Sequence, residues 1–135
     1  NLHKDVNKKL WESNGSEIDI FGNYLEESLD KLENYKGQVF RGVQDSVCDI
    51  ERYKSALENK SILVEFGFLS ASRSQIIAIG FGQILFKIYS KSAKEIEKIS
   101  HFKSEEEVIF KRNTSFKVFR VSIDDFFTII ILKEV

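Results

Sequence analysis

The sequence predicts an α+β domain, because a helical pattern fills its first half and a strand pattern its second. In the first half, apolar residues recur every three or four positions, which places them on one face of a helix. In the second half, apolar and polar residues alternate, as they do in a strand with one buried face. Helices precede strands instead of alternating with them, and 135 residues suffice for one domain, 1–135, with a substantial core.

Three helices and one short strand are expected in the first half. Leu2, Val6 and Leu10 form the apolar face of the first helix, and Asn14-Gly15 is a turn signal after it. The second helix carries acidic residues on its polar side and is expected to end in the segment 35–37. The predicted segments are helices over 2–10, 18–32 and 47–57 and a strand over 38–41.

Five strands and one short helix are expected in the second half. Ile62, Val64, Phe66 and Phe68 follow a period of two, so 62–69 is predicted as one strand. Ser72 has the residue type and the position of an N-cap for a helix over 73–80. The other strands are expected over 83–89, 106–110, 115–122 and 126–133.

Composition argues against several classes of protein. Lysine and arginine number 20 against 21 aspartates and glutamates, so the basic excess of a nucleic-acid binder is missing. Cys48 is the only cysteine, and His3 and His101 are the only histidines, so neither an intrachain disulfide nor a metal site is expected. Apolar runs such as 126–132 fall far short of the ~20 residues that span a membrane as a helix. We therefore expect no metal, no nucleic-acid partner and no membrane span. We also expect a monomer.

Arg41 lies near the end of the predicted strand 38–41 and is followed by Gly42. One interpretation is a solvent-facing arginine at a strand end. The functional interpretation needs an anion, because a guanidinium group binds phosphate oxygens with a planar fork of donors. A neighbouring glycine would let such a ligand approach the backbone.

Ser70 follows the apolar segment 62–69 and precedes the predicted short helix. A strand-to-helix turn explains Ser72 as a cap, but it leaves the hydroxyl of Ser70 free to face a cleft. A serine hydrolase is rejected, because no histidine and aspartate stand in a triad context and a Gly-x-Ser-x-Gly elbow is missing.

Glu105, Glu106 and Glu107 lead into an apolar strand. Three adjacent carboxylates usually form a solvated loop. If Glu107 opens a strand, Glu105 and Glu107 point to one side and Glu106 to the other. Two carboxylates on one side can divide two tasks, one stabilising a cationic sugar centre and the other holding a nucleophile.

Together and in this order, the three signals resemble the arginine-specific mono-ADP-ribosyltransferases, a branch of the ADP-ribosyltransferase toxin-like superfamily with an Arg…Ser…Glu signature. Segment 35–42 is similar to the family's lead-in to its first core strand, and 67–72 is similar to Gly-Phe-Leu followed by a Ser-Thr-Ser motif. Segment 105–110 is similar to the Glu-x-Glu motif and the strand after it. The likeness runs over nearly the whole chain.

The resemblance implies a fold and a binding site for NAD. In this family two small sheets pack face to face at a steep angle and form the cleft for NAD, with helices around them. By position, Arg41 would bind the NAD diphosphate and Gly42 the nicotinamide carboxamide. Ser70 would bind the nicotinamide ribose and orient Glu107. Phe81 would pack against nicotinamide, or else lie in the core.

The resemblance also implies the reaction, which is transfer of ADP-ribose from NAD to an exposed arginine of a protein substrate. Glu107 would be the catalytic carboxylate that stabilises positive charge on the ribose. Glu105 would draw in the acceptor guanidinium and accept its proton. Ser72 would mainly shape the turn. NAD is then a co-substrate, and no metal is needed.

The sequence departs from the family pattern at several points. Ala71 replaces a common threonine, and Lys111-Arg112 stands where prolines are usual, but neither change removes an expected site residue. The chain cannot be stapled by disulfides, which favours a cytosolic or injected, effector-like protein over a stapled ectoenzyme.

Two other functions are compatible with the same residues. Water could replace arginine as the acceptor, which would make the protein an NAD glycohydrolase. A binding module that has kept the fold without turnover is the third hypothesis, against which the intact Arg41, Ser70, Glu105 and Glu107 argue.

Overall fold

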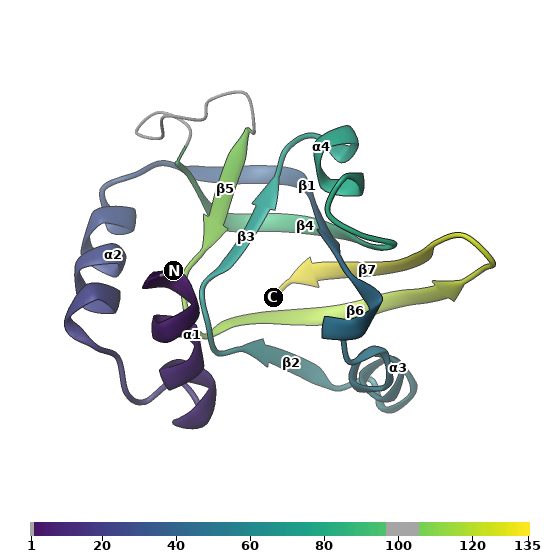
Figure 1. The fold of residues 1–135 in the computed structure, drawn as a ribbon, viewed down its shortest axis with the longest axis horizontal. Helices are drawn as coiled ribbons and strands as arrows, with labels where there is room; N and C mark the ends of the chain where they lie inside the picture. Colours follow the sequence, from purple (N-terminus) through teal and green to yellow (C-terminus); the bar gives the residue numbers. More distant parts are fainter. Residues whose placement is uncertain (1, 97–105) are drawn as a thin grey trace.

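The computed structural model describes residues 2–96 and 106–135, and Figure 1 shows how their elements are arranged. The expectations for His101 and Glu105 fall on 97–105 and lie outside the described residues. In chain order the elements are α1 (Leu2–Glu12), α2 (Ile20–Asp30), β1 (Asn34–Val43), the 3₁₀ turn η1 (Asp45–Val47), α3 (Ile50–Asn59), β2 (Ile62–Glu65), β3 (Leu69–Ser72), α4 (Gln75–Ile79), β4 (Ile84–Glu95), β5 (Glu107–Phe110), β6 (Thr114–Ile123) and β7 (Thr128–Glu134).

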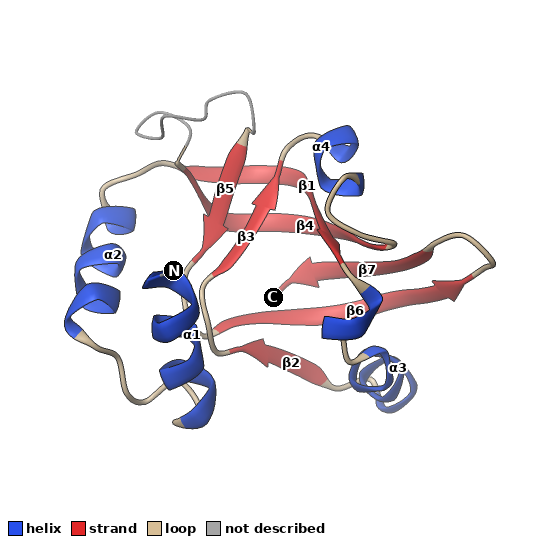
Figure 2. Cartoon of the chain, in the orientation of Figure 1, coloured by secondary structure: helices blue, strands red, loops and turns tan. Residues whose placement is uncertain are grey.

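Helices and strands are segregated as the sequence predicts, which confirms the α+β class. Figure 2 shows α1 and α2 together at one end of the sheet, with α3 and α4 at the other end. Three of the helices lie in the first half of the chain, and six of the seven described strands follow them. None of the described helices is both long and apolar enough to cross a membrane.

The seven strands are hydrogen-bonded in the order β1-β3-β5-β4-β7-β6-β2. Strand β4 is the hub, because it pairs antiparallel with β1, parallel with β7 and, at its far end, antiparallel with β5. Strand β3 links β5 to β1 through the partners Ser72 and Phe40, so β1, β3, β5 and β4 close a ring of pairings. In Figure 1, β3 and β5 run across β1 and β4. The two strand groups that the family resemblance implies are therefore joined through β4.

Two apolar clusters hold this arrangement together. The larger one joins the inner faces of the strands to α3 and includes Val39, Ile88 and Phe110, all of which are fully buried. Burying such side chains stabilises the fold by about 1.5–3 kcal/mol each. The smaller cluster packs α1 and α2 against β5 and against Phe68, just before β3, and includes the buried Leu10 and Leu29.

The segment 62–69 was expected as one strand, and this expectation is wrong. It contains β2 and the first residue of β3, separated by Phe66, Gly67 and Phe68. The side-chain amide of Asn7, on α1, donates to the carbonyl oxygen of Phe68 at 3.0 Å and accepts from its amide at 2.7 Å. Because these backbone groups bond to a helix instead of to a neighbouring strand, the chain changes direction here.

The N-cap of the short helix α4 is Ser74 and not Ser72. The hydroxyl of Ser74 accepts from the amide of Ile77 at 3.3 Å, whereas Ser72 is still extended and paired with Phe40. The Ser72 hydroxyl instead accepts from the amide of Ser74 at 3.0 Å, which tightens the turn between β3 and α4. Strand β3 thus extends through Ser72, the residue that the sequence pattern had indicated as the helix cap.

Other boundaries also differ from the prediction, and β4 for example continues to Glu95 instead of ending at 89. The second helix ends at Asp30, and segment 35–37 belongs to β1, where a bulge lies between Tyr35 and Gly37. Val47 is not on a buried helix face, because it lies in η1 and is 74% exposed. The third helix begins instead at Ile50, with Asp49 as its N-cap.

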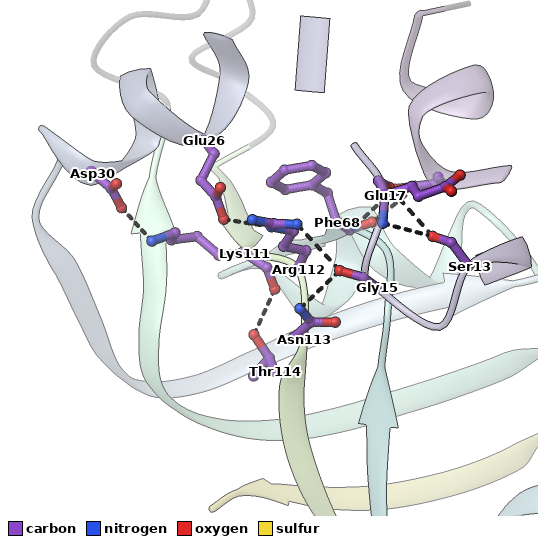
Figure 3. A network of polar contacts seen from close by, with 11 residues as sticks. Ser13, Gly15, Glu17, Glu26, Asp30, Phe68, Lys111, Arg112, Asn113 and Thr114 are labelled. Carbon is purple, nitrogen blue, oxygen red and sulfur yellow. Dashed lines mark hydrogen bonds and ion pairs between the residues drawn. The ribbon is translucent and has the colours of Figure 1, made fainter. Parts of the chain in front are cut away.

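Lys111 and Arg112, where the family pattern has prolines, clamp the α1–α2 unit to the β5–β6 turn (Figure 3). Arg112 donates through Nε to Glu26 at 2.9 Å and through Nη1 to the carbonyl oxygen of Gly15 at 3.2 Å. Lys111 forms an ion pair with Asp30, which lowers the pKa of that carboxyl group. The departure from the family pattern therefore has a structural role.

We predict that Arg112→Ala lowers the free energy of unfolding by about 1–3 kcal/mol, because it leaves a half-buried Glu26 and the Gly15 carbonyl without this donor. Thermal or urea denaturation measures the change. Lys8→Ala is the control, since its pair with Glu12 is exposed and its loss should cost less than about 0.5 kcal/mol. Equal effects of the two substitutions would contradict this role of Arg112.

Candidate functional site

A pocket of about 440 Å³, open to solvent, lies between β1, β3, α4 and the start of β5. Five residues singled out from the sequence line it, although they come from distant parts of the chain: Arg41, Gly42, Ser70, Phe81 and Glu107. The structure thus brings together every predicted site residue that it describes. Glu105 lies outside the described residues.

Arg41 is held in the pocket wall by β3. Its Nη1 donates to the carbonyl oxygen of Ser70 at 2.8 Å, and the Ser70 hydroxyl oxygen lies 3.4 Å from the same nitrogen. Burial lowers the pKa of Arg41, while the nearby Glu65 and Tyr53 act in the opposite direction. Arginine stays protonated in proteins, so Arg41 is a partly buried cation bonded to neutral oxygens. Within the described part of the chain its hydrogen bonds all use Nη1, which leaves donors for an anionic ligand.

The register of β3 and β5 decides which serine faces Glu107. Ser72 is the direct cross-strand partner of Glu107, and Ser70 is opposite Ile109. Directly opposite residues of an antiparallel pair share one face of the sheet, as do residues two apart on one strand. Ser70, Ser72 and Glu107 therefore share a face, with Ser72 the nearer to Glu107 in register. Ser72, which was expected mainly to shape the turn, also lines the pocket, and the sequence interpretation had not placed it there.

Glu106 interrupts the alternation that was expected for the acidic segment. The strand begins at Glu107, and Glu106 has a φ of +49°, in the left-handed region. The period of two therefore holds from Glu107 onward and does not include Glu106. This conformation is uncommon outside glycine and asparagine, and it persists where neighbours impose it.

Arg73 supplies contacts that hold Glu106 in place. Its backbone amide donates to the carbonyl oxygen of Glu106 at 3.0 Å. Its guanidinium lies 4.0 Å from the Glu106 carboxylate and 3.9 Å from that of Glu95, over the ring of Tyr35. The residue after the serine motif thus anchors the residue before Glu107. This anchoring fixes the direction in which β5 begins.

Gly42 is needed because α4 packs directly on its Cα. A Cβ at this position would lie 1.8 Å from the carbonyl oxygen of Ala78. A Cβ on Gly82 would likewise lie 2.1 Å from the carbonyl oxygen of Val43. The two glycines therefore allow the segment 75–82 to lie close against β1, where it forms one wall of the pocket.

Phe81 belongs to that wall and not to the core. Its side chain is 60% exposed, so the alternative of plain core burial is wrong. An exposed aromatic ring at the rim of a polar pocket can stack on a planar ligand group.

A second, larger cavity of about 1060 Å³ adjoins the first, and Arg41 lines both. Its polar wall is a triad in which the buried Glu65 accepts from Arg52 at 2.8 Å and from Tyr53 at 3.0 Å. Burial and Glu65 raise the pKa of Tyr53, so it remains a neutral donor. The Arg52 guanidinium also lies 5.1 Å from the ring centre of Trp11, another lining residue. The two cavities together can hold an extended ligand with an anionic centre near Arg41.

Histidine, cysteine and carboxylate side chains do not form a candidate metal centre anywhere in 2–96 or 106–135. The polar side chains that line the pocket are instead one guanidinium, two hydroxyls and one carboxylate. Such a set suits a ligand with phosphates and sugar hydroxyls.

Comparison with known proteins finds relatives in sequence. Residues 8–135 match the sequence model of the NAD:arginine ADP-ribosyltransferase family. Two curated relatives are 26% identical: the NAD(+)–arginine ADP-ribosyltransferase Mav of Mycobacterium avium, over 103 residues, and the NAD(+)–protein-arginine ADP-ribosyltransferase Tre1 of Serratia proteamaculans, over 102. The matches cover 74% and 76% of this chain but only 12% and 21% of those proteins. The chain therefore spans a small part of the length of these relatives.

Solved structures share the fold. The ADP-ribosyltransferase HopU1 of Pseudomonas syringae superimposes with a TM-score of 0.76 at 21% identity, over 99% of this chain and 66% of HopU1. The type III effector XopAI of Xanthomonas axonopodis gives 0.62 at 22%, over 76% and 45%. Vis, a toxin from Vibrio splendidus solved with agmatine, gives 0.65 at 26%, over 85% and 56%. The expected ADP-ribosyltransferase fold is confirmed.

We predict that Gly42→Ala weakens NAD binding at least tenfold while the chain remains folded, because the new Cβ must push α4 out of the pocket wall. Calorimetric titration with NAD measures the loss, and circular dichroism checks the fold. Gly80→Ala is the matched control in the same segment, since its Cβ would meet only the Ile77 carbonyl, at 3.3 Å. Undiminished NAD affinity in Gly42→Ala would show that the position of α4 does not define the site.

Proposed function

Because the chain belongs to the NAD:arginine ADP-ribosyltransferase family, we propose that residues 1–135 are a catalytic domain that transfers ADP-ribose from NAD to an arginine side chain of a protein. The observation that carries the proposal is the convergence of Arg41, Ser70 and Glu107 on one pocket. In the reaction the bond between ribose C1′ and the nicotinamide nitrogen breaks. A bond from C1′ to a guanidinium nitrogen forms, and one proton is released.

Arg41 is proposed to bind the diphosphate of NAD. It is partly buried, charged and shared by the two cavities, so a diphosphate bound there would have the rest of NAD on either side. The nicotinamide end would lie in the smaller pocket, with Gly42 at its carboxamide and Phe81 at its ring. The adenosine end would lie in the larger cavity. Charge-assisted hydrogen bonds from arginine to phosphate are among the strong ones in proteins.

Glu107 is proposed to stabilise the transition state. Departure of nicotinamide leaves positive charge on C1′ and the ribose ring oxygen, and a fixed carboxylate bound to the ribose 2′-hydroxyl offsets it. The β3–β5 register supports this role, because Glu107 stands opposite Ser72 on the face that carries Ser70. Ser70 would bind the nicotinamide ribose while also holding Arg41.

Glu105 is proposed to select arginine as the acceptor. A protonated guanidinium is a poor nucleophile, and a carboxylate can both bind it and accept its proton during attack. Vis, which is 26% identical to this chain, was solved with the guanidine compound agmatine. Agmatine is therefore the small acceptor of choice for a test.

NAD glycohydrolysis is the second candidate. The pocket is open to solvent and its rim residue Phe81 is largely exposed, so water can approach C1′ when no acceptor is bound. Hydrolysis would use the same Arg41 and Glu107.

We also propose that the domain acts as a monomer on a protein partner and reaches it as a secreted or injected effector. The names of Vis, a toxin, and XopAI, a type III effector, support this proposal.

The test is mass spectrometry of the products formed from NAD and agmatine. We predict ADP-ribosyl-agmatine and nicotinamide from the unmodified chain, and a rate at least about 10²-fold lower from Glu107→Gln, which cannot offset the charge. Free ADP-ribose without ADP-ribosyl-agmatine would favour the glycohydrolase. Absence of any turnover would contradict both candidates.

Glu105→Gln separates the two carboxylates. It should lose transfer to agmatine but keep hydrolysis of NAD, whereas Glu107→Gln should lose both. If the two substitutions reduced both activities equally, the separate roles would be wrong.

A further inference from the structure

An exposed apolar and acidic surface lies beside the site but takes no part in the proposed chemistry. It surrounds a cavity of about 510 Å³ at the base of the β6–β7 turn. Figure 1 shows this turn projecting beyond the other strands. The described residues that line the cavity include Phe126 and Phe127 on the turn, together with Asp45, Asp124 and Asp125, and no lysine or arginine. We call Asp45, Asp124, Asp125, Phe126 and Phe127 the turn surface.

The aromatic residues of the turn surface are held in place although they are exposed. The Asp124 carboxylate accepts from the amides of Phe126, at 2.8 Å, and Phe127, at 2.7 Å. The amide of Asp124 donates to the carbonyl oxygen of Phe127 at 3.1 Å and closes the turn. The Phe126 side chain is nevertheless 80% exposed. A large apolar side chain presented by a fixed backbone loses little conformational entropy when a partner covers it.

The turn surface is connected to the candidate site by a short path. The amide of Thr128, which follows the turn, donates to the carbonyl oxygen of Gln83 at 3.1 Å. Gln83 lines the same cavity and is two residues from Phe81, which lines the NAD pocket. A protein docked on the turn surface would therefore reach the rim of the pocket.

Charge decides what kind of partner fits. Three aspartates against no lysine or arginine in this lining attract cations and disfavour acidic surfaces. The aromatic side chains need apolar groups to cover them, because large exposed apolar patches mark interaction sites. A second copy of this chain is a poor match, since the same acidic surfaces would face each other in a two-fold dimer.

We propose that the turn surface is a docking site for the protein substrate, and that it binds a basic segment with apolar side chains near the acceptor arginine. This inference rests on the proposed transferase function. Phe126 and Phe127 anchor the apolar side chains, and Asp45 and Asp125 bind the lysines or arginines beside them. Docking raises the local concentration of the acceptor arginine at the pocket.

Two synthetic peptides and agmatine test the docking site. Both peptides contain one arginine joined by a Gly-Ser linker to an anchor segment, which alternates leucine with lysine in one peptide and leucine with glutamate in the other. We expect the chain to modify the lysine peptide with a kcat/KM at least about tenfold above that of the glutamate peptide. In Phe126→Ser and in Asp125→Lys this advantage should disappear, while kcat/KM for agmatine stays unchanged.

Tyr24→Ser is the matched control, because Tyr24 is 73% exposed but lies on α2 and lines neither the NAD pocket nor the cavity of the turn surface. It should keep the full preference for the lysine peptide. Equal kcat/KM for the two peptides in the unmodified chain would overturn the docking site, as would a loss in Phe126→Ser that affects agmatine equally. Sedimentation checks for self-association. If the unmodified chain self-associates and Phe126→Ser does not, the surface binds a second copy of the chain, and the docking site for the substrate is overturned.

Peptide binding separates a failure of docking from a failure of the proposed function. Fluorescence anisotropy with labelled peptides and no NAD measures docking directly. Preferential binding of the lysine peptide that is lost in Phe126→Ser supports the docking site even if agmatine is never modified. Equal binding of both peptides would refute docking whatever the agmatine result.

Discussion

The candidate site depends on one interaction, the hydrogen bond from Arg41 on β1 to the Ser70 carbonyl oxygen on β3. Only one residue pair, Phe40 and Ser72, registers β1 with β3 directly. The hydrogen bond from the Arg41 guanidinium therefore adds a second link between β1 and β3, beside the Phe40–Ser72 pair. This link lies in the wall of the pocket, where the positive charge faces the ligand site. A partly buried cation that is bonded only to neutral oxygens gains stability from an anion that enters the site.

The rest of the fold serves to keep this point fixed. Strand β4 pairs with β1 along its length and with β5 at its end, so the strands that carry Arg41 and Glu107 are fixed to the same support. The segment 75–82, which contains α4, forms one wall of the pocket because Gly42 and Gly82 allow backbone to lie against backbone there. Arg73 then anchors Glu106, just before Glu107. Backbone contacts thus set the positions of the strands and of the pocket wall that carry these side chains.

The sequence predicts the parts of this arrangement that depend on local pattern. Arg41, Ser70 and Glu107 could be singled out because each stands at the end or start of an apolar segment and because the three, in this order, resemble the family's Arg…Ser…Glu signature. Contacts between distant residues could not be predicted in the same way. Asn7 ends the pairing around Phe68 from 61 residues away, and the Ser72–Glu107 register follows from strand pairing that no local pattern encodes. The same limit explains why Ser74, and not Ser72, caps α4.

Arg41 offers the most direct test of the account, through the affinity of the chain for NAD measured by isothermal titration calorimetry. We predict that Arg41→Ala raises the Kd for NAD by about 30-fold or more, since it removes a charge-assisted contact to the diphosphate worth at least ~2 kcal/mol. Arg41→Lys should recover only part of the affinity, because an ammonium group lacks the planar fork. An unchanged Kd in Arg41→Ala, with the fold intact, would contradict the central claim that this guanidinium is the anchor of the NAD site.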